Sequence, residues 1–149
     1  MKSNFIQRAV TGLIFVAVLI GCILGGGIPF TILFALISAL TIHEFGTIVN
    51  RTGKVQMNKR ITVLAGVFLF LCFSYTGVVP GTYEIFIPYL FLMMYLLISE
   101  LYMKRKDPIN NWAYGMMSQM YIALPFALLN VLAYHTDGPE GVSQYNPIL

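Results

Sequence analysis

The amino-acid sequence predicts an all-α fold, a polytopic membrane helix bundle with about five transmembrane helices. The 149 residues are 58% hydrophobic and 10% charged, whereas soluble domains carry about 25% charged residues. The mean hydropathy is +0.77. The few charges gather in short polar segments between apolar runs that are long enough to cross a bilayer. This composition excludes an ordinary soluble domain. We expect the protein to lie in a phospholipid bilayer, and we expect no nucleic acid among its partners.

The first two spans are predicted from one long uncharged region. Residues 9–43 contain no Asp, Glu, Lys or Arg, and a single helix of that length would reach roughly 50 Å. Because the apolar core of a bilayer is only about 30 Å thick, the region has to break. The stretch GGGIP at 25–29 is the expected break. We therefore predict spans at about 9–25 and 29–49. The N-terminal segment lacks a signal-peptide cleavage site and is followed by a second apolar run, so it is read as a membrane helix.

Three further spans follow, at about 61–79, 85–103 and 112–134, separated by polar or turn-forming segments. Pro125 lies within the last of them and cannot donate a hydrogen bond to the carbonyl of Tyr121, so a kink is expected. The final residues, YNPIL, are typical of the start of another apolar segment. We therefore expect residues 1–149 to be the N-terminal transmembrane part of a larger membrane enzyme, without its catalytic C-terminal part.

The basic residues predict the orientation. All nine of them fall in three segments: Lys2, Arg8, Arg51, Lys54, Lys59, Arg60, Lys104, Arg105 and Lys106. The alternate connections, at 25–29, 77–84 and 135–149, contain none. Lys and Arg are enriched in the cytoplasmic loops of membrane proteins. We therefore predict a cytoplasmic N-terminus and a multi-pass protein of the inner (cytoplasmic) membrane.

Two ionisable residues interrupt the apolar pattern near the cytoplasmic face. Arg8 precedes the first span, and Glu44 lies one to two turns before the end of the second. Ionisable groups at this depth are costly and usually have a partner or face a cavity. If the two helices are antiparallel neighbours, Arg8 and Glu44 reach a similar depth. They are predicted either to form a structural ion pair or to line a polar cavity that binds substrate.

Glu100 lies at the same predicted face, with Lys104 four residues further on. This spacing favours a local ion pair on a helix, although Glu100 and Glu44 could also border one site. The pairs of small residues Gly21/Gly25 and Ala35/Ala39 allow either tight packing within the chain or a homodimer. A catalytic site with two metal ions needs several clustered carboxylates, and this pattern predicts no metal site in the chain.

Three segments resemble bacterial phosphatidate cytidylyltransferases, the CDP-diacylglycerol synthases. They are QRAVTGLIFV at 7–16, ALTIHEFGTIV at 39–49 and YIALPFALLNVLA at 121–133, in the order found in that family. Arg8, Glu44 and Phe45 match family positions. The stretch rich in Lys, Asp, His and Gly that is diagnostic of the family has no counterpart here. The resemblance therefore implies about the N-terminal half of such an enzyme, and no catalytic residue can be assigned from it.

The resemblance implies a transferase that makes CDP-diacylglycerol and pyrophosphate from CTP and phosphatidate. It also implies a divalent metal, Mg²⁺, for the whole enzyme, with ligands that are not in this chain. Residues 1–149 alone are expected to be inactive. The alternative hypothesis is a small non-enzymatic membrane protein, such as a transporter subunit or scaffold.

Overall fold

The computed structural model describes residues 2–103, 105, 107–136 and 143–146, with the side chains of all of these except 2–5, 135, 136 and 143. Within this part, five segments are long and apolar enough to cross a membrane: Ile6–Leu24, Gly27–Arg51, Lys59–Val78, Tyr83–Tyr102 and Pro108–Ala133. The predicted all-α fold class with five spans is confirmed. The limits differ from those predicted by at most four residues.

The first two spans are separate helices, α1 (Lys2–Leu24) and α2 (Gly27–Arg51). Gly26 joins them with a φ of 110°, a conformation that glycine adopts readily and other residues do not. Pro29 lies in the first turn of α2, where its missing N–H group is not needed by the helix. The predicted break at GGGIP is therefore confirmed.

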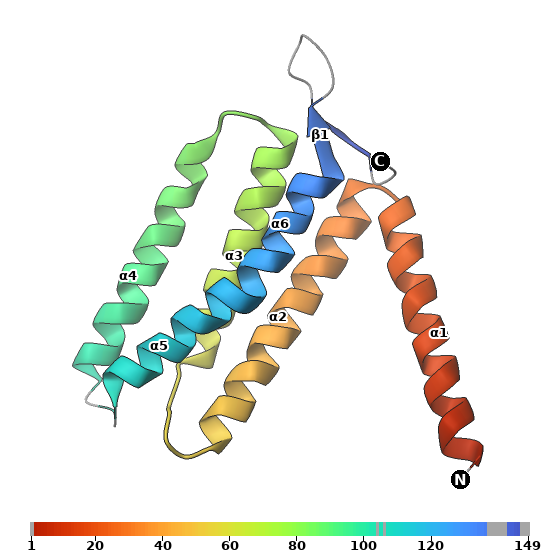
Figure 1. Ribbon diagram of the computed structural model, residues 1–149. Coiled ribbons are helices and arrows are strands. Elements are labelled where there is room, and N and C mark those ends of the chain that lie inside the picture. The colour runs from red at the N-terminus through yellow and green to blue at the C-terminus, as the bar shows by residue number, and fades with distance from the viewer. Residues whose placement is uncertain (1, 104, 106, 137–142, 147–149) are drawn as a thin grey trace.

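Three helices pack against α3 (Lys59–Val78), namely α2, α4 (Ile87–Tyr102) and α6 (Leu124–Ala133) (Figure 1). The short 3-10 helix η1 (Tyr83–Phe86) leads into α4. One buried cluster in this core joins Ile42 of α2, Leu69 of α3 and two alanines of the last span.

The last span contains a π-helical turn, η2 (Gln119–Ala123), between α5 (Pro108–Ser118) and α6. The helix changes direction there, just before Pro125, as predicted (Figure 1). A π turn is one way to accommodate a residue that cannot donate to the i−4 carbonyl. The turn also directs Gln119 inward, and its Nε2 donates to the backbone oxygen of Thr62 at 2.9 Å.

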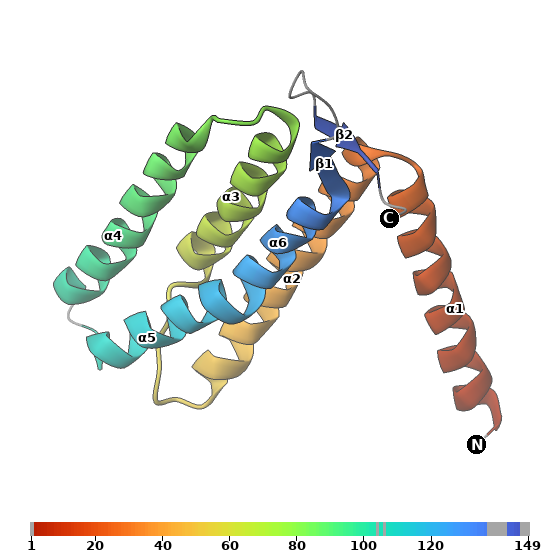
Figure 2. The same cartoon turned by 45° about the horizontal axis from the view of Figure 1, so that its top comes forward.

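Helix α1 diverges from the bundle below its junction with α2, in both views (Figures 1 and 2). No residue in the apolar stretch of α1 is buried. At the junction, the Tyr145 hydroxyl donates to the Ile23 carbonyl at 2.6 Å. Burial raises the pKa of this phenol, so it stays protonated and able to donate.

Tyr145 belongs to a small feature that the sequence reading did not anticipate. Strands β1 (Tyr134–Thr136) and β2 (Ser143–Tyr145) form an antiparallel pair after α6. The expected beginning of a further apolar segment is YNPIL at 145–149, and its last three residues, 147–149, lie outside the described residues.

Candidate functional site

The segments that carry basic residues meet at one end of the molecule. The beginning of α1, the end of α2, the beginning of α3 and the α4–α5 connection all lie at the lower end in Figure 1. We call this the basic end. Its described basic side chains are Arg8, Arg51, Lys54, Lys59, Arg60 and Arg105.

A buried polar cluster lies at the basic end, formed by the side chains of Glu100, Arg105 and Asn111 with the backbone of Gln56. We call it the Glu100 cluster. Glu100 lies in the last turn of α4 with only 3% of its side chain exposed. Its Oε1 lies 3.2 Å from Nη1 of Arg105, and its Oε2 accepts from Nδ2 of Asn111 at 3.2 Å. Both oxygens of this buried carboxylate therefore have partners, as a charge in a low-dielectric environment requires.

The same cluster fixes the loop between α2 and α3. The backbone N–H of Gln56 donates to Asn111 Oδ1 at 2.7 Å, and its carbonyl accepts from Arg105 Nη1 at 2.8 Å. One residue further, Asn50 donates to the carbonyl of Met57 and accepts from its N–H, at 3.0 and 2.8 Å. The α2–α3 loop is thus joined by hydrogen bonds to α5 and to the α4–α5 connection, which are distant from it in sequence.

A small cavity adjoins the cluster, with a volume of about 10 Å³. Glu100, Asn111, Thr62 and Trp112 are among its lining residues. Its volume is about that of one water molecule, so it cannot hold a nucleotide. Trp112 is the one tryptophan of the chain, and it therefore reports on this place alone.

The chemistry available at the cluster is anion binding rather than proton transfer. The Glu100 carboxylate is buried and already bound on both oxygens, so it is poorly placed to act as a base. Arg105 keeps 27% of its side chain exposed. A guanidinium held in this way is suited to phosphate groups.

The structure does not bring Arg8 and Glu44 together. Both side chains are exposed, and the one ion pair among the described residues joins Arg105 to Glu100. The physical reason is that α1 diverges from α2 instead of packing along it (Figures 1 and 2). The predicted partner of Glu100, Lys104, lies outside the described residues.

Comparison with known proteins decides the family. The model of the cytidylyltransferase family matches residues 6–142, which is most of the chain. This chain belongs to the cytidylyltransferase family. It is the family of CDP-diacylglycerol synthase, and the three segments that carry the resemblance all lie within the matched range. No curated protein and no solved structure matches the chain.

The Mg²⁺ that a cytidylyltransferase implies does not fit the residues described here. Among them, no group of three or more His, Cys, Asp or Glu side chains lies close enough to hold a metal ion. Glu100 is already engaged by Arg105 and Asn111. No metal-dependent step can therefore be derived from these residues.

Sequence reasoning missed Arg105 and Asn111 as the partners of Glu100, and it missed the backbone of Gln56 as the group that binds both of them. The helical spacing of Glu100 and Lys104 assumed that α4 continues, but α4 ends at Tyr102. Asp107 then adopts a left-handed conformation, with φ of 55° and ψ of 63°, before Pro108 begins α5. The sequence feature that could have indicated a partner for Glu100 is the pair of polar residues Asn110 and Asn111, directly after this turn.

Proposed function

We propose that this chain provides the membrane-embedded, lipid-binding part of a CTP:phosphatidate cytidylyltransferase of phospholipid biosynthesis. In that reaction a phosphate oxygen of phosphatidate attacks the α-phosphorus of CTP. The bond between the α-phosphorus and the bridging oxygen breaks, giving CDP-diacylglycerol and pyrophosphate. The proposal rests on the family match over residues 6–142, in a bundle whose basic segments share one end.

Charge supports this assignment, because both substrates are anionic. Each Lys or Arg near a membrane surface attracts an anionic headgroup by roughly 1 kcal/mol. The positive-inside rule favours the cytoplasm for the basic end, and CTP is cytosolic. Arg105 is our candidate for the phosphate contact, since it is held by Glu100 and the Gln56 carbonyl while part of it remains exposed.

Arg8 and Glu44 have different proposed roles. Arg8 is exposed at the same end of the bundle, so we include it among the groups that attract a phosphate headgroup. Glu44 would repel such a headgroup. Its exposed position on α2 favours a contact with a polypeptide element that packs on this helix.

The test uses Trp112, which lines the cavity beside Glu100, as a reporter. The purified chain in detergent micelles is titrated with lipids brominated on their acyl chains, which quench tryptophan fluorescence on contact. We expect brominated phosphatidate to quench at a several-fold lower mole fraction than brominated phosphatidylglycerol or phosphatidylcholine. Equal quenching by phosphatidate and phosphatidylglycerol would contradict phosphatidate as the substrate and would favour the non-enzymatic alternative. It would not affect the assignment of the chain to its family.

Two variants locate the effect. Arg105→Gln should reduce the preference for phosphatidate several-fold, because it removes the positioned guanidinium. Lys54→Gln is the matched control, since Lys54 is an exposed cation in the neighbouring loop. If both variants lose the preference equally, a diffuse positive charge rather than Arg105 is responsible.

A further inference from the structure

A second cavity lies at the end of the bundle opposite to the basic end. It has a volume of about 470 Å³, which is within the usual range of about 300–1,000 Å³ for small-ligand sites. Residues of α3, η1 and α6 line it. Because it is separated from the Glu100 cluster by the length of α3, it is independent of the proposed cytidylyltransferase function. We call it the Asn130 pocket.

The pocket takes its name from a buried amide with an unused acceptor. Asn130 lines the pocket and is 0% exposed. Its Nδ2 donates to the Ala127 carbonyl at 3.1 Å. That carbonyl can only accept, so it fixes which end of the amide faces it. The remaining atom, Oδ1, has no hydrogen-bond partner among the described residues, although buried amide oxygens are nearly always satisfied.

A second acceptor lines the same pocket. The hydroxyl of Thr76 uses its proton within α3, toward the carbonyls of Cys72 and Phe73 at 3.0 and 3.1 Å. Its oxygen therefore has only lone pairs left to offer a ligand. Asn130 Oδ1 likewise carries no proton, so a ligand that reaches either oxygen has to carry N–H or O–H donors.

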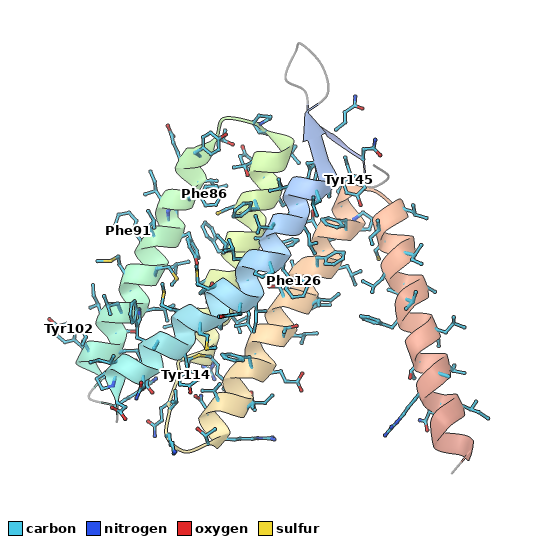
Figure 3. The ribbon with its side chains drawn as sticks, in the orientation of Figure 1. Phe86, Phe91, Tyr102, Tyr114, Phe126 and Tyr145 are labelled. Atoms are coloured by element: carbon cyan, nitrogen blue, oxygen red, sulfur yellow. The ribbon has the colours of Figure 1, made fainter. Side chains whose placement is uncertain are left out.

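Aromatic rings make up much of the remaining wall, from Phe73, Tyr83, Phe86 and Tyr134. Phe73 and Phe86 meet edge to face, with ring centroids 5.3 Å apart, and Phe86 lies at the upper end of the bundle in Figure 3. The faces of such rings attract cations. Tyr residues at this level are typical of the membrane–water interface, which places the pocket at headgroup depth.

The charges at this end select the sign of the ligand. Every Lys and Arg of the chain lies in the segments of the basic end. Glu84, exposed in η1 beside Tyr83, is the charged side chain described near this pocket. A net anionic headgroup would meet no Lys or Arg here, whereas an ammonium group would meet ring faces and a nearby carboxylate.

We propose that the Asn130 pocket binds the primary ammonium headgroup of a zwitterionic phospholipid, of the phosphatidylethanolamine class. A primary ammonium carries three N–H donors for Asn130 Oδ1 and Thr76 Oγ1. A choline headgroup carries the charge without the donors, and a glycerol headgroup carries donors without the cation. The lipid comes from the leaflet at the end opposite to the basic segments, with its acyl chains along the apolar exterior of the bundle.

The first experiment changes the lipid and leaves the protein intact. The purified chain in detergent is titrated with phosphatidylethanolamine, its N-methyl and N,N-dimethyl derivatives, phosphatidylcholine and phosphatidylglycerol, and bound lipid is counted by native mass spectrometry. We expect the affinity to fall with each N–H group that is removed. The fall between phosphatidylethanolamine and phosphatidylcholine should be at least fivefold. Equal affinities along the series, or phosphatidylglycerol binding as tightly as phosphatidylethanolamine, would overturn the proposal.

The second experiment changes the acceptors. Thr76→Val and Asn130→Leu keep the side-chain volume nearly constant, and each should weaken phosphatidylethanolamine binding at least threefold while leaving phosphatidylcholine binding unchanged. Thr41→Val is the matched control, because the Thr41 hydroxyl likewise donates to a carbonyl of its own helix but lies outside the pocket. A full preference for phosphatidylethanolamine in both pocket variants would exclude this pocket as the site.

Discussion

Asn111 is the residue that makes the charge of Glu100 tolerable inside the bundle. Its amide nitrogen donates to the carboxylate, and its amide oxygen accepts from the backbone of Gln56. Asn111 is only 1% exposed, so water cannot replace either bond. A single amide thereby couples α4, α5 and the α2–α3 loop.

We predict that Asn111→Ala destabilises the folded chain by about 2 kcal/mol, because a buried group left without its hydrogen-bond partner costs about 1–3 kcal/mol. Unfolding in detergent, followed by circular dichroism, measures this. Asn110→Ala is the matched control, since Asn110 is exposed, and it should change stability by less than about 0.5 kcal/mol. Equal losses for the two neighbours would show that the hydrogen bonds of Asn111 contribute little.

The charged side chains of Arg8 and Glu44 are predicted to act independently of each other. Since both are exposed and share no ion pair, Arg8→Gln and Glu44→Gln should have additive effects on stability, within about 0.5 kcal/mol. The double-mutant cycle is read from the same unfolding curves. A double variant that is clearly more stable than the sum of the singles would show that the two side chains do interact.

At the scale of elements, the crossing of α2, α3 and η2 depends on Gly66. A Cβ atom at this position would collide with Cδ1 of Ile42 and lie 3.3 Å from Cβ of Ala123. Ile42 and Ala123 are both fully buried. Close approach of helices over small residues is a common way to gain packing in membranes.

We predict that Gly66→Ala destabilises the bundle by about 1–3 kcal/mol, which is typical of overpacking. Ile42→Val removes the obstructing methyl group, so the double variant should recover part of the loss. Gly21→Ala serves as the control, because a Cβ there meets nothing within 4 Å. Thermal unfolding in detergent distinguishes the outcomes, and strictly additive losses would show that Ile42 is not the obstacle.

The same elements show what sequence alone could predict. The five spans and the break at Gly26 follow from local signals, namely uncharged runs, glycines and prolines. The partners of Glu100 do not, because they depend on where α4 ends and on how α5 returns across the α2–α3 loop. The divergence of α1 could not be predicted from the sequence pattern either. An apolar helix has the same pattern whether lipid or protein surrounds it.

For the whole molecule, the two ends have opposite chemical character. One end gathers the basic segments and a buried, neutralised carboxylate, and it suits anionic substrates. The other end presents acceptors and aromatic rings around a large pocket. The division follows from the alternation of basic and non-basic connections along the chain. The charge pattern from which the orientation is predicted therefore also separates the two proposed sites.

This division also bears on catalysis by the chain alone. The described carboxylates form no group that could hold a metal ion. Glu84 lies at the far end, Glu44 is exposed on α2, Asp107 is exposed before α5, and Glu100 is bound by Arg105 and Asn111. Phosphoryl transfer of this kind depends on positioned charge around the reacting phosphates.

We therefore predict that residues 1–149 supplied with radiolabelled CTP, phosphatidate and Mg²⁺ form no CDP-lipid above a protein-free blank. A complete CDP-diacylglycerol synthase is the positive control. Turnover that survives repurification and is lost in Glu100→Gln would show that the Glu100 cluster is catalytic after all.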